Sequence, residues 1–221
     1  MDILAELAKL QTPGEQITFL KNVTSEQRAF KEGFEITPAI SQYKNEYDVL
    51  KHKIFTDLVT FPDKTMVTEF TDENGIKTQT TSIVKLNRIG LPYQKKIVKA
   101  AVTFLFGNPV KYISTPEKDS EKTLFEAFNK VIELNKMKFQ DKALAESTCR
   151  FTQGVELWYT EPEKNSLYGF DSAAKIKCKV LTPDVYNFYP YFDENDDLVA
   201  FSREFTDPND TKTIYFETYT A

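Results

Sequence analysis

The sequence predicts an α+β protein in which helices come first and an antiparallel β meander comes last. Three observations predict this class. Apolar residues recur at helical spacing through most of the first 60 residues. Apolar and polar residues alternate in several short segments after residue 155. Turns rich in aspartate and asparagine separate these segments, as expected where one strand leads directly into the next.

The composition is that of a globular protein. Of the 221 residues, 41% are hydrophobic and 28% are charged, which excludes disorder of the whole chain and allows a sizeable core. The net charge of −5 gives no reason to expect a dedicated nucleic-acid binder. No apolar stretch is long enough for a membrane span, and the first residues lack the features of a signal peptide. We therefore expect a cytosolic or particle-associated protein.

Residues 1–60 predict a helical N-terminal arm. Pro13 is expected to open one short helix, Thr24 to cap the next, and Pro38 to stand in the first turn of a longer one. Because these helices are polar over most of their circumference, we expect the arm to pack on the rest of the chain or on a neighbour. Residues 61–221 are expected to form one α+β domain.

A β-hairpin is predicted directly after this arm. Two stretches rich in threonine and other strand-forming residues, 65–71 and 76–81, flank the dipeptide Asn74-Gly75. Asn-Gly between two such stretches is the strongest short-range hairpin signal, because both residues tolerate the positive φ that the tight turn needs.

Residues 82–116 contain six basic side chains and no acid. Pro92 is expected to open a helix that ends at Gly107, and a short strand, Val110–Ile113, is expected to follow.

Lys95, Lys96 and Lys99 lie on this predicted helix and are the candidate contact residues of the chain. They are predicted to face an acidic surface of a neighbouring subunit or chain, or DNA. The alternative is a solvated basic face with no partner.

Two helices are expected between residues 119 and 153, with Ser120 as the N-cap of the first. Five strands are expected to follow, at 155–160, 175–181, 185–192, 198–205 and 213–219. The acidic segment 193–197 is interpreted as an exposed hairpin turn, because it lacks the central glycine and distal glutamate of a calcium loop. The aromatic residues between 186 and 192 are expected in the core or at a subunit contact.

The sequence contains no linear signature of catalysis, cofactor binding or metal binding. Cys149 and Cys178 form no C-x-x-C motif, and His52 is the only histidine, so a zinc site of the usual type is not predicted. A Cys–His pair remains a formal alternative to two structural thiols.

Three stretches of the sequence resemble the bacteriophage portal protein family. The first runs from Asn87 to Val98 and leads into Phe104-Leu105-Phe106-Gly107-Asn108-Pro109-Val110. The second is the helix pair at 120–153, followed by Gly154-Val155-Glu156-Leu157-Trp158-Tyr159. The third runs from Leu181 to Asp193 and continues through Leu198–Phe205 to Glu217-Thr218-Tyr219-Thr220. The resemblance covers about residues 85–221, and the first 80 residues carry none.

The resemblance implies a structural subunit and no enzyme, with no catalytic residues, cofactor or metal. Portal proteins form a ring, dodecameric in the full-length protein, at one capsid vertex, and double-stranded DNA is packaged and ejected through its channel. The implied partners are other copies of the chain, capsid protein, packaging terminase, head–tail connector proteins and the passing DNA, with no membrane. The implied location is the portal vertex of the virion, and the bacterial host cytoplasm during assembly.

Family members are usually much longer and have wing, stem, clip and crown regions. This chain is similar to the N-terminal part of the wing, so we expect a fragment without stem, clip or crown. Two alternatives stay open at this point. One is another virion or prophage interaction protein with a similar fold, and the other is an enzyme without a linear motif.

Overall fold

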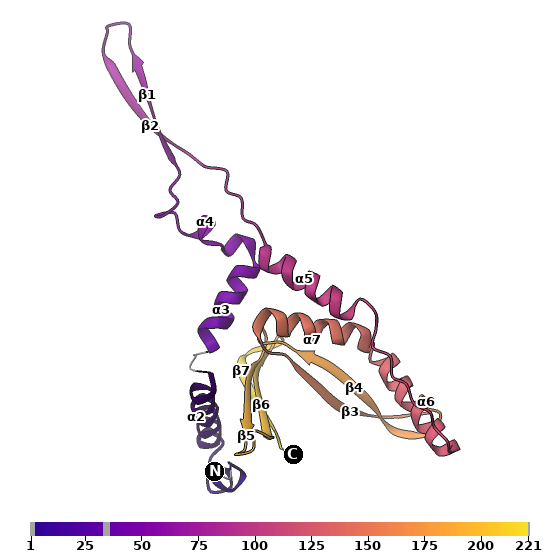
Figure 1. Ribbon diagram of the computed structural model, residues 1–221. Helices are drawn as coiled ribbons and strands as arrows, with labels where there is room; N and C mark the ends of the chain where they lie inside the picture. Colours follow the sequence, from indigo (N-terminus) through magenta and orange to yellow (C-terminus); the bar gives the residue numbers. More distant parts are fainter. Residues whose placement is uncertain (1–2, 33–35, 221) are drawn as a thin grey trace. The chain divides into compact units, whose positions relative to one another are not determined.

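The computed structural model describes residues 3–32 and 36–220 (Figure 1). Helices dominate the first two thirds of the chain and antiparallel strands the last third, which confirms the predicted α+β class. The helices are α1 (Ile3–Leu7), α2 (Pro13–Glu32), α3 (Ile36–Tyr47), the 3₁₀ turn η1 (Val49–Lys51), α4 (Lys53–Thr56), α5 (Tyr93–Phe106), α6 (Asp119–Leu134) and α7 (Met137–Phe151). The strands are β1 (Lys64–Thr71), β2 (Lys77–Val84), β3 (Val155–Asn165), β4 (Ser172–Leu181), β5 (Asn187–Phe192), β6 (Leu198–Asp207) and β7 (Asp210–Thr220).

The chain divides into two compact units. The first comprises Met1–Ile40 together with Val98–Ala221, and the second comprises Ser41–Ile97. The second unit holds the β1–β2 hairpin, and the first holds the two remaining sheets, β3–β4 and β5–β6–β7. The predicted division into an arm of residues 1–60 and a domain of residues 61–221 stays a prediction.

The main apolar core of the first unit lies between α2 and the β5–β6–β7 sheet. Leu20 and Val23 of α2 pack with Tyr191 of β5 and Ala200 of β6, and all four are buried. Helix α2 runs without interruption from Pro13 to Glu32, so the predicted helix start at Thr24 is wrong. Thr24 lies in the middle of α2 with 2% of its surface exposed. Burial of this face of α2 against the sheet outweighs the weak helix propensity of threonine.

One ion pair reinforces this contact between helix and sheet. The Lys21 ammonium lies 2.8 Å from the Glu204 carboxylate, which also accepts a 2.7 Å hydrogen bond from the Tyr189 hydroxyl. Burial works to raise the pKa of Glu204, but these hydrogen bonds and the Lys21 charge outweigh it, so the pKa lies below its ordinary value.

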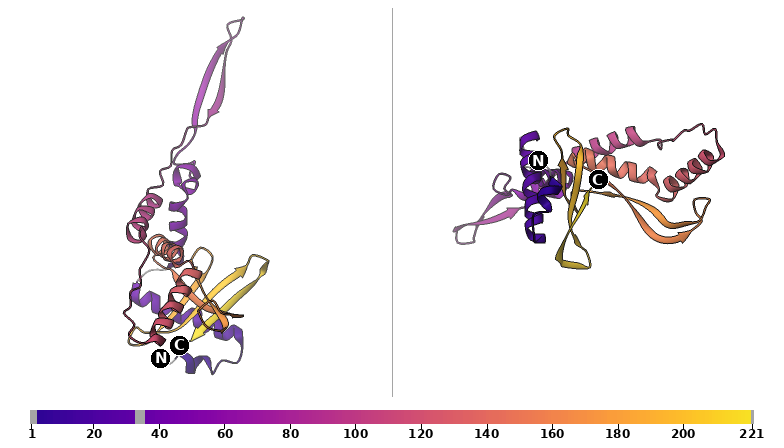
Figure 2. Two further views of the ribbon diagram at one scale, coloured as in Figure 1. Left: turned by 90° about the vertical axis from the view of Figure 1, so that its right-hand side faces the viewer. Right: turned by 90° about the horizontal axis from the view of Figure 1, so that it is seen from below.

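The β3–β4 hairpin packs against the α6–α7 helix pair, with α7 lying along β4 (Figure 1 and Figure 2). The contact is made partly by two amide side chains that bond the backbone of β4. Asn135, between the helices, donates to the Ile176 carbonyl at 3.0 Å and accepts from the Cys178 amide at 2.7 Å. Gln140 of α7 accepts from the Val180 amide and donates to the Cys178 carbonyl. The β3–β4 sheet has two strands among the described residues, so one edge of β4 has no strand beside it. The two side-chain amides hydrogen-bond to backbone groups along that edge.

Two local predictions in this region are wrong. The N-cap of α6 is Lys118 and not Ser120, because the carboxylate of Glu121 reaches back to the Lys118 backbone amide and supplies the cap interaction. The segment Val110–Ile113 forms no strand. Among the described residues, no strand pairs with this segment. Its Tyr112 ring packs edge-on against the Phe128 ring of α6, with ring centroids 5.0 Å apart.

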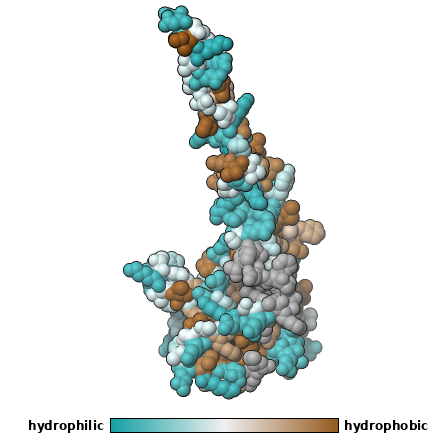
Figure 3. Space-filling model, turned by 90° about the vertical axis from the view of Figure 1, so that its left-hand side faces the viewer, coloured by the Kyte–Doolittle hydropathy of each residue, from teal (hydrophilic) through white to brown (hydrophobic). Residues whose placement is uncertain are grey.

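The β1–β2 hairpin forms as predicted and has a paired register from Lys64↔Val84 to Thr71↔Lys77. Its connection is longer than the expected tight turn, because five residues, 72–76, separate the last pair and Asn74 does not take a positive φ. Gly75 takes a φ of +79° in the turn, which is the conformation that glycine adopts without steric cost. Every residue of both strands is exposed, and apolar side chains lie among hydrophilic ones on its surface (Figure 3). No third strand extends this sheet among the described residues.

We expect this hairpin to open readily in the isolated chain, because a two-stranded sheet without a packed face is marginally stable in water. In hydrogen–deuterium exchange, the amides of β1 and β2 should exchange no more than ~10-fold slower than those of an unstructured peptide, and those of β6 more than ~1000-fold slower. Equal protection of the two regions in the monomer would contradict this prediction.

Candidate interaction surface

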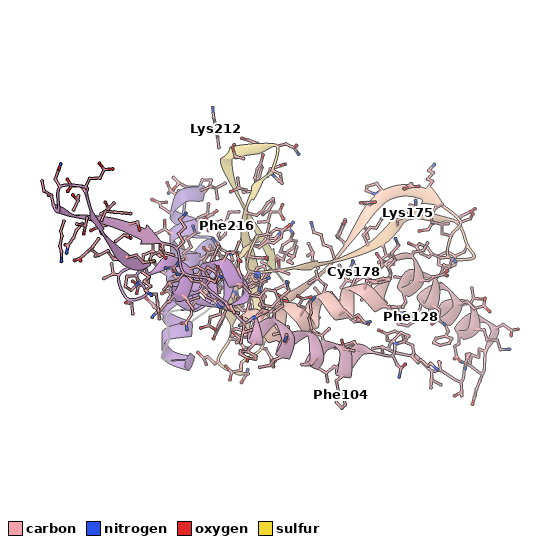
Figure 4. The ribbon with its side chains drawn as sticks, turned by 90° about the horizontal axis from the view of Figure 1, so that it is seen from above. Phe104, Phe128, Lys175, Cys178, Lys212 and Phe216 are labelled. Atoms are coloured by element: carbon pink, nitrogen blue, oxygen red, sulfur yellow. The ribbon has the colours of Figure 1, made fainter. Side chains whose placement is uncertain are left out.

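Helix α5 carries apolar side chains on two opposite sides. Val98 and Val102 are buried, whereas Tyr93, Ile97 and Phe104 are exposed, Phe104 with 90% of its surface. Figure 4 shows Phe104 pointing outward from the helix. A helix with apolar residues on both sides is normally covered on both. We call the exposed row Tyr93, Ile97, Ala100 and Phe104 the α5 stripe; its members are three or four positions apart and so share one face.

The three candidate lysines lie on α5, as predicted, and all are exposed. The Lys95 ammonium lies 5.6 Å from the centre of the Tyr47 ring, a cation–π contact within the second unit. Lys96 borders the α5 stripe, because it lies three positions after Tyr93 and four before Ala100. Lys99 lies three positions after Lys96 and extends this basic face away from the stripe. Their role as contact residues stays a prediction.

An open, mainly apolar groove of about 700 Å³ lies in the first unit. The end of α7 and the start of β3 form one wall, and residues of the β5–β6–β7 sheet form the other. Apolar side chains at the groove remain exposed in part, including Trp158, Leu198 and Tyr219 with 42%, 53% and 38% of their surface. Exposed apolar surface gathered in a concave site is typical of a binding surface.

The acidic turn between β5 and β6, Asp193–Asp197, adjoins this groove. Phe192 and Leu198 flank the turn in sequence, and both line the groove. The turn is the exposed hairpin turn that the sequence predicts: Asp193 accepts hydrogen bonds from the backbone amides of Asn195 and Asp197. These amides hold the pKa of Asp193 below its ordinary value. Four of the five residues of the turn are acidic.

Beside the groove, a partly buried ion pair joins β6 and β7, two positions along each strand from the groove residues Phe201 and Tyr219. Arg203 of β6 donates through Nε and Nη2 to one carboxylate oxygen of Glu217 on β7, at 2.8 and 2.5 Å. The Tyr219 hydroxyl donates to the same oxygen at 2.7 Å. Burial works to raise the pKa of Glu217, but the hydrogen bonds from Tyr219 and Arg203 outweigh it and keep the pKa below its ordinary value.

Aromatic rings enclose the Arg203 guanidinium, which lies 4.9 Å from the centre of the Phe205 ring and 5.6 and 5.8 Å from those of Tyr186 and Tyr219. Two of the aromatic residues between 186 and 192 lie in the core, as predicted: Tyr191 is completely buried and Phe188 is 5% exposed. Tyr186, Tyr189 and Phe192 are half-buried, and their predicted place in the core or at a subunit contact stays a prediction. The network serves to align β6 with β7, and so positions Phe201 and Tyr219 at the groove.

The residues considered for chemistry take structural positions. Burial raises the pKa of the Cys178 thiol to about 11, so this thiol is protonated and a poor nucleophile at neutral pH. Cys149 is exposed, and the Nε2 atom of His52 lies 2.9 Å from the Glu46 carbonyl in the turn after α3. Within residues 3–32 and 36–220, no group of three or more His, Cys, Asp or Glu side chains is arranged to hold a metal ion. Over the same ranges, no helix has the length and apolar character that a membrane span requires.

Sequence reasoning missed the groove and the α5 stripe. The stripe could have been found, because Tyr93, Ile97 and Phe104 share one helical face that is distinct from that of Val98 and Val102. The groove could not, because its walls come from segments at least 30 residues apart whose packing no local pattern encodes.

Comparison with known families identifies the class of this protein. Residues 31–221 match the family described as "Phage portal protein, SPP1 Gp6-like". The chain belongs to this phage portal protein family, which is a structural family, and the resemblance of residues 85–221 is thereby confirmed. No curated protein matches the chain.

Proposed function

We propose that the chain is a structural subunit of a phage portal ring through which double-stranded DNA is packaged into the capsid and later ejected. The observation that carries this proposal is the family match over residues 31–221. The proposed partners are further copies of the chain, capsid protein, the packaging terminase, the head–tail connector proteins and the DNA in the channel. The proposed location is the portal vertex of the virion, reached from the cytoplasm of the bacterial host. We also propose that the chain itself catalyses no reaction.

The exposed apolar surface supports an assembling protein. The α5 stripe, both faces of the β1–β2 hairpin and the groove all leave apolar side chains in contact with water. An isolated soluble protein rarely leaves so much apolar surface exposed in several places, whereas a subunit covers it in the assembly.

Native mass spectrometry on the product of the complete reading frame tests the proposal. We expect a closed ring of about a dozen subunits, in line with the cyclic symmetry of most homo-oligomers. The 221-residue chain measured beside it shows whether these residues assemble alone. A complete product that stays monomeric at every concentration would contradict the proposal and favour an interaction protein with a similar fold.

A further inference from the structure

We propose that α5 of one copy docks in the groove of the next copy, with Lys96 and Lys99 facing the acidic turn Asp193–Asp197. The inference rests on the proposed function, because a closed ring of identical subunits needs one contact between two different surfaces. It names those surfaces and the side chains that join them.

The first step is shape and polarity. The α5 stripe is a protruding apolar surface, with Phe104 at 90% exposure, and the groove of about 700 Å³ is a recessed apolar surface of the same chain. Residues at spacings of three and four on one helical face are the usual anchors of a helix that docks in an apolar groove. Aromatic anchors contribute most to such contacts, so Phe104 is the expected centre.

The second step is charge. Residues 82–116 carry six basic side chains and no acid. Lys96 borders the α5 stripe, and Lys99 lies one turn along on the adjoining face. The acidic turn places four carboxylates in five residues at the edge of the groove, beside Phe192 and Leu198. Apolar surface thus meets apolar surface while basic residues meet acidic ones, and this complementarity sets the orientation of the contact.

The apolar stripe also favours a protein partner over DNA for these lysines. A phosphate backbone is bound through charge and hydrogen bonds, and it offers no apolar surface to Ile97 or Phe104. A neighbouring copy offers both the carboxylates and the apolar groove.

A charge exchange in the product of the complete reading frame tests the proposal. Lys96→Glu with Lys99→Glu, or Glu194→Lys with Asp197→Lys, should each raise the protein concentration needed for ring formation by on the order of 100-fold, because like charges then meet at the contact. All four substitutions in one chain should restore assembly. Lys95 is left unchanged because its ammonium already contacts the Tyr47 ring. Asp193 is left unchanged because its carboxylate accepts the Asp197 amide and so stabilises the turn.

The matched control changes net charge equally but elsewhere. Lys164→Glu with Lys212→Glu alters two exposed lysines, near the end of β3 and the start of β7, and should leave assembly unchanged. Figure 4 shows Lys212 pointing outward.

Phe104→Ala should weaken assembly by roughly 30-fold without changing the stability of the monomer, since Phe104 is exposed there. Phe139→Ala, at 64% exposure on α7, is its control.

Three results would overturn the inference. The first is normal rings from both charge-reversed variants. The second is normal rings that retain less DNA, which would place the lysines against DNA. The third is assembly that tolerates Phe104→Ala but fails with Leu198→Arg, which would mean that something other than α5 occupies the groove. In each case wild-type rings still support the portal role, whereas an absence of wild-type rings would contradict the portal role itself.

Discussion

Replacing Asn135 by alanine should lower the free energy of unfolding by about 3 kcal/mol. Its amide group makes three hydrogen bonds at the junction of α6 and α7: it donates to the carbonyls of Val131 and Ile176 and accepts from the Cys178 amide. Asn135 is 7% exposed, so the strand groups left behind would be shielded from water and without a partner. An unsatisfied buried group costs about 1–3 kcal/mol.

Urea denaturation followed by the fluorescence of Trp158 measures this effect, since Trp158 pairs directly with Cys178 across the β3–β4 hairpin. Gln140→Ala, which removes a longer and less buried pair of hydrogen bonds to β4, should cost about 1 kcal/mol. Asn195→Ala, in an exposed turn, is the matched control and should change stability by less than about 1 kcal/mol. An Asn135→Ala protein as stable as the wild type would show that the amide does not hold the helices to β4.

Replacing Glu217 by glutamine should destabilise the chain by about 2 kcal/mol at neutral pH, because it removes the countercharge of a guanidinium that is nearly inaccessible to water. The Arg203 side chain is 8% exposed, and its Nη1 atom has no hydrogen-bond partner within the described residues. Glu217 is 42% exposed, which reduces the cost below that of a fully buried pair. Glu163→Gln, which breaks the more exposed ion pair with Lys175, is the control and should cost less than about 1 kcal/mol.

The same pair predicts a pH dependence with a definite sign. The pKa of Glu217 is lower in the folded chain than its ordinary value of 4.5, so its contribution to stability is fully present above pH 4.5. The contribution is lost as the pH falls through the folded-state pKa. The stability difference between wild type and Glu217→Gln should therefore shrink below pH 4.5, as measured by urea denaturation at a series of pH values. A difference that stays constant to lower pH would contradict the role assigned to this carboxylate.

Local sequence patterns determined most of the secondary structure. Gly75 in the β1–β2 turn, the proline before α5 and the acidic turn at 193–197 each specify a backbone conformation through the residue itself, so each is visible without the rest of the chain. The run of aromatic residues in β5 indicated burial on both faces, because successive side chains of a strand point to opposite faces, and Phe188 and Tyr191 on opposite faces are both buried. The ordered motifs from residue 85 onward likewise indicated the portal family, since family resemblance depends on sequence alone.

Tertiary packing decided what local patterns left open. Thr24 lies inside α2 because the neighbouring apolar side chains are buried against the β5–β6–β7 sheet, an interaction that outweighs its own capping preference. In the sequence, Asn135 stands between two predicted helices. In the structure its buried amide donates a hydrogen bond to the carbonyl of Ile176 in β4, 41 residues away. The groove exists only because β3 and the β5–β6–β7 sheet lie beside each other. The physical reason is common to all three: contacts between distant segments depend on the summed burial of many side chains, and no short stretch of sequence contains that sum.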